Sequence, residues 1–304
     1  MVIPCHNEER TIADVVRGFA QVLPEAQLFV YDNSCTDATS QQAQSAGAVV
    51  RREPRLGKGN VVRRMFADVD ADVYVVVDGD GTYDPGAART MVDLLLDERL
   101  DMVVGCRAPA PDDDRVYRKG HAFGNAAFTR ILRVVFGGDF TDVFSGYRVI
   151  SRRLAKSFPA QSAGFEIETE LSVHAVQLAA PCAEVATTYR SRQGDSNSKL
   201  RTGRDGVRIL FTALGLFRHM RPLQFFGSLF VLLTALAVAL GIPVVDEYVR
   251  TGLVARFPTA ILAAAIQTVA FICLSSGLVL DNVVGARKEA RRLAYLQIPP
   301  VDRM

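Results

Sequence analysis

Two long stretches without a formal charge, residues 223–245 and 257–280, constrain most strongly what this chain of 304 residues can fold into. At about 1.5 Å per residue, a helix of either length reaches roughly 35 Å, which is enough to cross the ~30 Å hydrocarbon core of a bilayer. A helix in the core of a water-soluble protein rarely remains uncharged over such a length. The pattern therefore predicts a C-terminal transmembrane hairpin made of these two segments.

The charges that flank the two stretches predict how the hairpin is oriented. Residues 199–221 carry six Lys or Arg residues against one Asp, and residues 281–304 carry five more basic residues. Because basic residues are retained on the cytoplasmic side of a membrane, both ends of the hairpin are expected in the cytoplasm. We predict a juxtamembrane amphipathic helix at 207–221, a basic cytoplasmic tail at 281–304 and a multi-pass protein of the cell (inner) membrane.

Short apolar runs alternate with helical patterns over residues 1–206. Runs at 27–31, 48–51, 73–77 and 102–106 predict strands, and the stretches between them predict helices. This order is typical of an α/β nucleotide-binding domain, whose ligands lie at the carboxyl ends of the strands. No secretory signal is visible, so the domain is expected in the cytoplasm. The apolar run at the very start of the chain is short for a buried strand, which leaves the true start of the protein open.

The run 73–77 ends abruptly at Asp78 and Asp80, which are separated and followed by glycine. Its uninterrupted apolar character predicts a strand buried on both faces of a parallel sheet. Two carboxylates at the end of such a strand can converge on Mg²⁺ or Mn²⁺, which usually share their ligands with substrate phosphates. The alternative is a solvated Asp-Gly turn, but the preceding strand favours a metal site.

Two further turns carry residues of the kind that bind nucleotides. Gly57, Lys58 and Gly59 precede the helix predicted at 61–68, where glycine allows close backbone approach and the helix dipole favours an anion. The spacing is not that of a P-loop. Asp32 ends an earlier strand, and it is expected either to accept hydrogen bonds from a base or ribose or only to cap its own turn.

Three features in the second half of residues 1–206 have roles that the residues alone leave open. Residues 121–136 form an amphipathic pattern that fits either a surface helix or a helix lying on a membrane. Glu166, Glu168 and Glu170 start a further helix, but carboxylates at alternating positions cannot share one helical face. Some of them are therefore expected only to complement the helix dipole. The basic, Gly- and Ser-rich loop 190–201 is the kind of surface that grips a phosphate.

Composition narrows the class of partner and the compartment. The formal net charge of +2 gives no indication of nucleic-acid binding. The five cysteines form no C-x-x-C pair and the four histidines show no ligand spacing, so neither a zinc site nor a disulfide framework is expected. This usage fits a reducing compartment.

Several short motifs follow one another in a fixed order. They are Pro4, Asn7 and Glu8; then Asp32, Ser34 and Asp37; then Gly57, Lys58 and Gly59; then Asp78 and Asp80; then Arg107; then Ser145, Gly146 and Arg148; and last Arg192, Gly194, Ser196 and Lys199. Together they resemble the inverting GT-A glycosyltransferases of family 2, in particular the polyprenyl-phosphate branch that includes dolichyl-phosphate mannose synthase. The resemblance covers residues 1 to about 206 by motif, and the two-span C-terminus is similar to bacterial members in architecture only. It implies a GT-A domain with a mostly parallel sheet, interfacial helices and the transmembrane hairpin.

The resemblance also implies roles for individual residues. The nucleotide sugar would contact Pro4, Asn7, Glu8, Asp32, Ser34, Lys58, Asp78 and Gly79. The residues implied in catalysis are Asp80, Arg148 and Glu170. A cofactor Mg²⁺ or Mn²⁺ would be held by Asp78, Asp80 and Thr82, of which Thr82 stands where many relatives have a Gln ligand. The acceptor phosphate would be bound by Arg107, Arg118, Ser145, Arg192, Ser196 and Lys199.

The activity implied by this resemblance is the inverting transfer of a hexose to a polyprenyl phosphate, undecaprenyl or dolichyl, at the cytoplasmic membrane face. UDP-glucose or UDP-N-acetylglucosamine is favoured as the donor over GDP-mannose. Because a phosphate monoester with a second pKa of about 6 is already anionic near neutrality, no general base is required, and the roles of Glu168 and Glu170 stay open. The bacterial two-span members also suggest a homo-oligomer.

Two other functions are considered. A processive polysaccharide synthase of the same superfamily would carry a Q-x-x-R-W motif, and this chain has no Trp. A non-catalytic membrane adaptor would be expected to have lost Asp80, Lys58 or the basic loop, and the chain retains all three. The sequence therefore favours the polyprenyl-phosphate glycosyltransferase.

Overall fold

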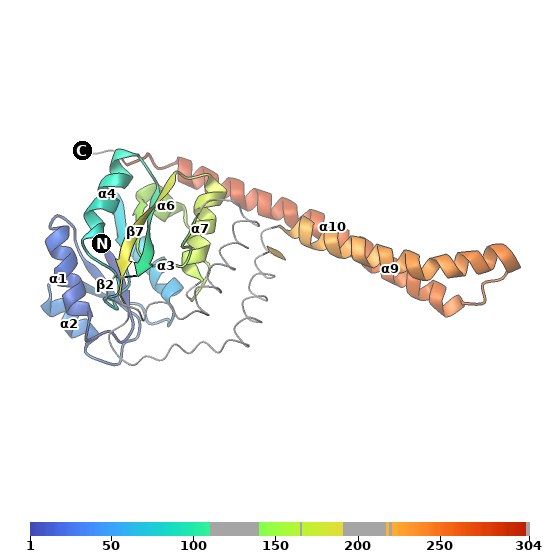
Figure 1. Cartoon of the computed structure of the whole chain (residues 1–304), viewed down its shortest axis with the longest axis horizontal. Helices are drawn as coiled ribbons and strands as arrows, with labels where there is room; N and C mark the ends of the chain where they lie inside the picture. Colours follow the sequence, from blue (N-terminus) through green and yellow to red (C-terminus); the bar gives the residue numbers. More distant parts are fainter. Residues whose placement is uncertain (110–139, 165, 191–216, 219–220, 302–304) are drawn as a thin grey trace. The chain divides into compact units, whose positions relative to one another are not determined.

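The chain divides into two compact units, and the computed structural model describes residues 1–109, 140–164, 166–190, 217–218 and 221–301. The first unit is Met1–Thr202 together with Ala290–Met304, and the second is Gly203–Glu289. Figure 1 shows the chain coloured along its sequence. The amphipathic stretch 121–136 and most of the expected helix at 207–221 lie outside the described residues.

The first unit is built on a seven-stranded sheet with the order β3-β2-β1-β4-β6-β5-β7. In chain order the strands are β1 Val2–Cys5, β2 Phe29–Asp32, β3 Val49–Arg52, β4 Val73–Val76, β5 Met102–Pro109, β6 Arg148–Ser151 and β7 Cys182–Tyr189. Strand β6 runs antiparallel to β4 and β5, and the other pairings between these strands are parallel. The expected α/β fold with a mostly parallel sheet is confirmed.

Helices cover both faces of this sheet. They are α1 Ile12–Val22, α2 Thr39–Ser45, α3 Lys58–Asp68, α4 Ala87–Asp97, α6 Arg152–Ser157 and α7 Ile167–Leu178. Local chemistry sets some of their starts: the Ser151 hydroxyl accepts from the backbone N–H of Leu154 (3.3 Å) and so caps α6. Helix α3 begins at Lys58, three residues before the start predicted from the apolar pattern.

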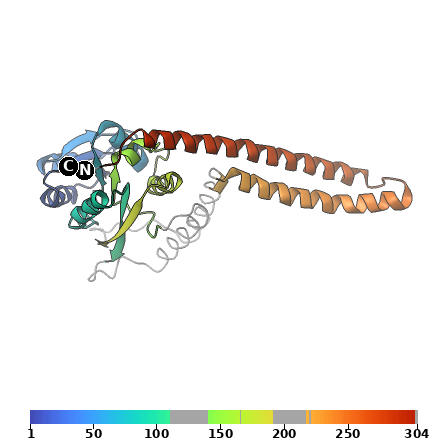
Figure 2. The same ribbon diagram turned by 90° about the horizontal axis from the view of Figure 1, so that it is seen from above.

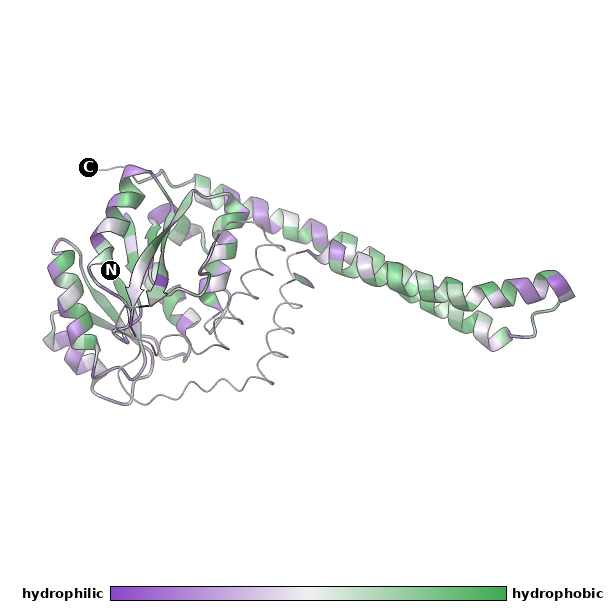
Figure 3. Cartoon of the chain, in the orientation of Figure 1, coloured by the Kyte–Doolittle hydropathy of each residue, from purple (hydrophilic) through white to green (hydrophobic). Residues whose placement is uncertain are grey.

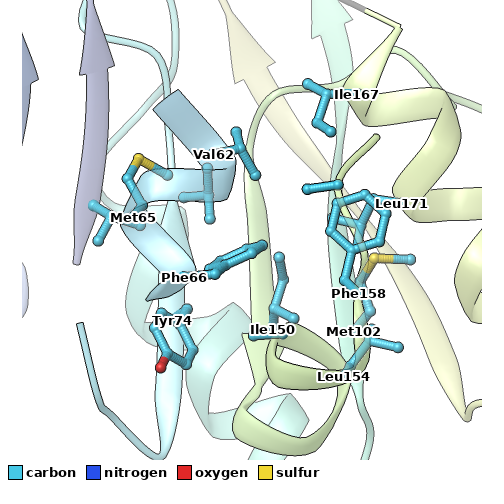
Figure 4. Packing of buried hydrophobic residues seen from close by; sticks show 14 of the residues in the cluster. Val62, Met65, Phe66, Tyr74, Met102, Ile150, Leu154, Phe158, Ile167 and Leu171 are labelled. Atoms are coloured by element: carbon cyan, nitrogen blue, oxygen red, sulfur yellow. The ribbon is translucent and has the colours of Figure 1, made fainter. Parts of the chain in front are cut away.

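Two apolar clusters, one on each face of the sheet, form the core. Along β4, Tyr74 and Val76 belong to the cluster under α3 and α7, whereas Val75 belongs to the cluster under α1 and α4. This alternation follows from the two-residue period of a strand. Figure 4 shows the first cluster, in which Phe66 of α3 lies near Ile150 of β6. The expected strand is confirmed over Val73–Val76, with side chains packed on both faces of the sheet, but it pairs in parallel with β1 and antiparallel with β6.

A single buried amide ties together the turns at the carboxyl edge of β1, β2 and β3. Asn33 follows β2, and its Nδ2 donates to the carbonyl oxygens of Glu53 (3.0 Å) and Arg55 (2.8 Å). Its Oδ1 accepts from the backbone N–H of Gly57 (2.7 Å), directly before α3. Its own backbone N–H donates to the carbonyl oxygen of Cys5 (2.9 Å). Because Asn33 is buried, these bonds form away from water and fix the turns against one another.

The second unit contains a helical hairpin. Helices α9 Pro222–Thr251 and α10 Phe257–Leu296 run side by side (Figures 1 and 2). Across the pair, Gln267 Nε2 donates to Thr234 Oγ1 (3.3 Å). The facing stretches are predominantly apolar (Figure 3), and both helices are long and apolar enough, by length and composition, to cross a membrane. These helices indicate an association of the protein with a membrane.

The last helix is longer than the sequence predicts. Residues 281–304 were expected to form a basic tail, but α10 continues to Leu296. From Ala290 onward it belongs to the first unit, where Tyr295 is buried in the core cluster under α3 and α7. The charges of this segment indicate a solvated tail, but the large ring of Tyr295 draws its helical part into the core.

Replacing Asn33 by Ala should lower the free energy of unfolding of the α/β unit by about 2–4 kcal/mol, because it leaves buried carbonyl and N–H groups without partners. The midpoint of thermal unfolding can be followed by the reaction of buried Cys5 with a thiol-specific dye in the detergent-solubilised chain. Asn60→Ala, which removes an exposed bond to the Leu56 carbonyl oxygen (3.1 Å) and a bond from Arg63 Nη1 (3.3 Å), serves as the matched control and should cost less than about 1 kcal/mol. Equal midpoints for the two variants would contradict the role of Asn33.

Candidate active site

The turn after β4 packs directly on the turn after β1. A Cβ atom at Gly79, the middle residue of the Asp-Gly-Asp motif, would clash with Cys5 Sγ and with a carboxylate oxygen of Glu8. Thr11 Oγ1 also donates to the Gly79 carbonyl oxygen (2.8 Å). Glycine is therefore required here by protein packing, and the contact brings Glu8 beside the motif.

The ammonium of Lys58 lies between two carboxylates. Its Nζ pairs with Glu168 Oε1 at 2.5 Å and also forms an ion pair with Asp78 Oδ1. The side chains of Lys58 and Glu168 are 8% and 7% exposed, and that of Asp78 is 24% exposed. Burial alone would lower the pKa of Lys58, but the charges of Asp78 and Glu168 raise it above its ordinary value, so the ammonium stays charged. The ion pair joins α3, the turn after β4 and α7 at one point.

Burial and ion pairing act in opposite directions on Glu168. Burial raises the pKa of Glu168, and the charge of Lys58 opposes that shift. Its Oε2 is buried and has no hydrogen-bond partner among the described residues. We call the carboxylates of Asp78, Asp80 and Glu168 the acidic centre. Glu168, whose role the sequence left open, contributes to it a buried acceptor atom.

The two glycines that flank Lys58 serve a different purpose from the one expected. A Cβ at Gly57 would clash with the carbonyl oxygen of Ala163, and one at Gly59 with that of Ser162. The backbone N–H of Gly59 donates to Ala163 (3.0 Å). The sequence predicts that an anion approaches these glycines closely. In the structure the carbonyl groups of Ser162 and Ala163 do so, and this contact fixes the start of α3.

Glu170 supports this backbone contact. Its side-chain hydrogen bonds go to the loop at residues 161–162. Its carboxylate accepts from the N–H groups of Gln161 (2.9 Å) and Ser162 (2.8 Å). These bonds give Glu170 a supporting role, because they hold the loop that packs on Gly59. The catalytic role expected for Glu170 stays a prediction. Glu168 and Glu170 look equivalent in sequence, but their carboxylates bond to different partners.

The Asp-Gly-Asp motif offers a divalent cation carboxylate oxygens. Asp80 Oδ1 accepts from the Thr82 hydroxyl (2.6 Å) and N–H (3.2 Å). Thr82 is buried and its hydroxyl is bonded to Asp80, so it orients this carboxylate, and its role as a third ligand stays a prediction. Among the described residues, no group of three or more His, Cys, Asp or Glu could hold a metal by itself. Carboxylates such as those of Asp78 and Asp80 are ligands that Mg²⁺ commonly shares with substrate phosphates and water.

The residues expected to bind the nucleotide on β1 and β2 make bonds within their turns. Asp32 accepts from the N–H of Cys35 (2.7 Å) and from Ser40 Oγ (2.6 Å), which is the capping alternative considered from the sequence. These bonds hold the pKa of Asp32 below its usual range although burial opposes them. Asn7 adopts a positive φ of 58°, and its Oδ1 accepts from the N–H of Thr36 (2.8 Å). The two turns are thereby preformed side by side.

Ser34 and Pro4 are also expected to bind the nucleotide, and they differ in their burial. Ser34 also has a positive φ (57°), and its hydroxyl donates to the Pro54 carbonyl oxygen (3.0 Å). Pro4 is buried within β1, opposite Tyr31 of β2. Pro4 therefore supports the sheet beneath the turns.

The turn before β6 packs closely against Asp78. A Cβ at Gly146 would clash with Asp78 Oδ2, and the N–H of Gly146 donates to the Tyr83 hydroxyl oxygen (2.9 Å). Burial raises the pKa of Tyr83, so the phenol stays neutral. No pattern in the sequence indicates a role for Tyr83. For Asn33 a signal exists, because it is an amide directly after a strand at the carboxyl edge of the sheet.

Arg148 and Ser145 serve the backbone of this turn. Arg148, which is 2% exposed, donates to the carbonyl oxygens of Ser145 (2.9 Å) and Val143 (2.8 Å) and to Ser172 Oγ (2.9 Å). Ser145 Oγ donates to the Gly105 carbonyl oxygen (2.5 Å). Both side chains are buried and bonded within the protein, and the roles expected for them in catalysis and in binding the acceptor phosphate stay predictions.

Arg107 is held in a two-pronged pair with Asp142. Its Nε and Nη2 lie 2.8 and 2.7 Å from the two carboxylate oxygens, and its guanidinium lies 5.6 Å from the centre of the Tyr189 ring. Burial would lower the pKa of Arg107, but the bond to Asp142 raises it. An acceptor phosphate would have to compete with this carboxylate, so the contacts do not favour the role expected for Arg107.

The basic loop begins beside the acidic centre. The backbone N–H of Arg190 donates to the carbonyl oxygen of Thr82 (2.9 Å), and Tyr189 pairs with Tyr83, with their ring centroids 5.2 Å apart. The remaining residues expected to bind the acceptor lie outside the described residues; they are Arg118, Arg192, Ser196 and Lys199.

Replacing Lys58 by Met should destabilise the domain by about 3–5 kcal/mol, because it leaves buried carboxylates without their counter-ion. Adding Glu168→Gln should recover part of this loss. In the Lys58→Met variant, the pKa of unpaired Glu168 should be higher in the folded chain than in the unfolded chain, where it is about 4.3. The free energy of unfolding should therefore fall as the pH rises above about 4.3. Thermal midpoints of the three proteins between pH 5 and 8 provide the measurement. A single variant as stable as the wild type at pH 8 would contradict the ion-pair account.

Known proteins resemble this chain in both sequence and fold. The family model described as glycosyl transferase family 2 matches residues 1–158. Glycosyltransferase AglJ from Haloferax volcanii is 34% identical over 255 residues, which cover 82% of this chain and 82% of that protein. Protein RfbJ from Shigella flexneri is 53% identical over 121 residues, which cover 40% of this chain and 93% of that protein.

A solved structure shares the fold. Glucosyl-3-phosphoglycerate synthase from Mycobacterium tuberculosis, in complex with Mn²⁺, UDP and phosphoglyceric acid, has a TM-score of 0.56 and 24% identity, covering 70% of this chain and 76% of that chain. At this level of identity the likeness concerns the fold alone. The family match, the relatives and the seven-stranded sheet agree. The chain therefore belongs to glycosyl transferase family 2 and is a glycosyltransferase of the GT-A fold.

Proposed function

We propose that this enzyme carries out a metal-dependent, inverting transfer of a hexose from a nucleotide sugar to a polyprenyl phosphate. The observation that carries the proposal is the bond between Arg190 and Thr82, because it joins the start of a basic loop to the turn that orients Asp80. A transfer between two phosphorylated substrates requires both a cation-binding centre and a phosphate-binding loop. The two apolar helices favour a lipid as the acceptor.

On the donor side, Asp78 and Asp80 would hold Mg²⁺ or Mn²⁺ against the diphosphate. A cation bound there supplies positive charge that offsets the charge developing on the leaving nucleoside diphosphate. Lys58 forms an ion pair with Asp78 and holds its side chain in place, and Thr82 orients Asp80. The mycobacterial synthase of similar fold was crystallised with Mn²⁺ and UDP. UDP-glucose and UDP-N-acetylglucosamine are therefore the first donors to test, ahead of GDP-mannose.

On the acceptor side, we assign the phosphate to Arg192 and Lys199, with Arg118 and Ser196 as further contacts. The phosphate monoester has a second pKa of about 6, so its attacking oxygen is already anionic near neutral pH. This chemistry needs no general base. Direct displacement at the anomeric carbon inverts it, and an α-linked donor yields a β-linked polyprenyl phosphosugar.

The bonds of the two glutamates agree with a reaction that has no general base. Glu168 is paired with Lys58, and Glu170 is occupied by backbone amides. Neither needs to take a proton from the acceptor. We therefore give Glu168 a positioning role toward Lys58 and leave Glu170 out of the chemistry.

The proposal includes a location. The domain at 1–206 would lie in the cytoplasm, with spans 223–245 and 257–280 crossing the cell (inner) membrane and their connecting loop outside. The excess of basic residues at both ends of the hairpin supports this orientation. A homo-oligomer is part of the same proposal.

The function can be tested by offering the full chain in detergent a panel of UDP-glucose, UDP-N-acetylglucosamine and GDP-mannose with undecaprenyl phosphate. The expected result is one lipid product whose mass rises by a single sugar with one donor. A polymeric product would favour a processive synthase. No transfer from any of the donors would refute the proposal.

The metal assignment predicts that Asp80→Asn lowers the transfer rate by about 10²–10³-fold, since charge stabilisation of the leaving group is lost. Chelation with EDTA should abolish transfer by the wild type, and added Mn²⁺ should restore it. Asp84→Asn, a substitution at an exposed position in the same segment, is the matched control and should stay within threefold of the wild type. Transfer that resists both EDTA and Asp80→Asn would overturn the assignment.

A further inference from the structure

The end of α10 is bonded into the α/β unit. The Tyr295 hydroxyl donates to Asp101 Oδ2 (2.6 Å). Asp101 is fully buried, and its carboxylate also accepts from Ser151 Oγ (2.6 Å) and from the Arg153 guanidinium (2.5 and 2.8 Å). The same guanidinium lies over the Tyr295 ring, 4.7 Å from its centre. Tyr295 is thus joined to the starts of β5 and α6 through one shared carboxylate.

Two arginines near Tyr295 hold the C-terminal end of α7. Arg292 donates to the carbonyl oxygen of Leu178, and Arg291 donates to Gln177 Oε1 (3.1 Å). Leu178 is the last residue of α7, and Ala179 follows it in the left-handed conformation, with φ 49°. The final carbonyl groups of a helix lack partners within it, and cations there complement the helix dipole. The end of α10 therefore caps α7.

The opposite end of α7 carries Glu168. The helix has 12 residues and is about 18 Å long, so the first turn reaches the acidic centre while the last turn reaches α10. Ile167 and Leu171, which Figure 4 shows near the start of α7, belong to the same core cluster as Leu178 and Tyr295. A packed helix moves as a rigid element, so a shift at its last turn displaces its first turn.

We propose that Tyr295 and Arg292 are positioning residues for the active site. Tyr295 holds the end of α10 that carries Arg292, and Arg292 holds the last turn of α7. Together they set where Glu168 meets Lys58 and hence how firmly Asp78 is held. The effect on transfer rests on the proposed function, but the effect on α7 does not. A contact that adds only core stability would leave the Glu168–Lys58 pair unchanged.

The structural part is tested by hydrogen exchange of the full chain in detergent. Tyr295→Phe removes the hydroxyl and keeps the ring, and Arg292→Met removes the cap. Both should speed exchange of the amides in the first two turns of α7 by at least threefold, whereas Arg292→Lys should restore most protection. Tyr248→Phe, which alters an exposed tyrosine of α9, is the matched control. Unchanged exchange at the start of α7 would overturn the proposal.

The functional part is tested by a double-mutant cycle on the transfer rate. Tyr295→Phe should lower kcat about fivefold with KM within twofold of the wild type, and it should have less than a twofold effect when added to Glu168→Gln. An equal effect in both backgrounds would show that Tyr295 does not act through Glu168 and would overturn the inference. If the wild type transfers no sugar, the proposed function fails, and the exchange result alone decides the positioning of α7.

Discussion

The ammonium of Lys58, buried between the carboxylates of Asp78 and Glu168, is the interaction on which the rest of the active site depends. Moving charges out of water costs several kcal/mol per ion, and removing one partner leaves that cost uncompensated. The three elements that supply these groups must therefore stay together. Two sets of contacts hold these elements together. They are the backbone packing around Gly57 and Gly59 and the cap on α7.

The sheet and the position of the Asp-Gly-Asp motif could be predicted because both depend on local pattern. An apolar run such as 73–77 is buried on both faces wherever it lies in a parallel sheet, and the polar residues after it must lie at the carboxyl edge. The partner of Lys58 could not be predicted in this way. Glu168 lies on a distant helix, and nothing in its spacing distinguishes it from Glu170.

Motif matching also cannot tell whether a polar residue serves a substrate or the protein's own backbone. Arg148 and Ser145 fit a substrate-binding pattern, yet both are buried and bonded to carbonyl groups. The glycines around Lys58 fit an anion-binding turn, yet the carbonyl groups of residues 162–163 occupy the space that they open. Tyr295 is a further example, because the basic residues near it in the sequence do not indicate that its side chain is buried in the core. In each case the deciding factor is a contact between segments that lie far apart in the sequence.

The central claim is that a divalent cation binds at Asp80 while Lys58 remains paired with Glu168. Crystals of the full chain grown with Mn²⁺ and UDP, measured at the manganese absorption edge, test it most directly. The account predicts an anomalous peak about 2.1 Å from an Asp80 carboxylate oxygen, bridged to the diphosphate, with the Lys58–Glu168 pair intact. A peak elsewhere, or a Lys58 side chain that has left Glu168 to bind the phosphates, would contradict it.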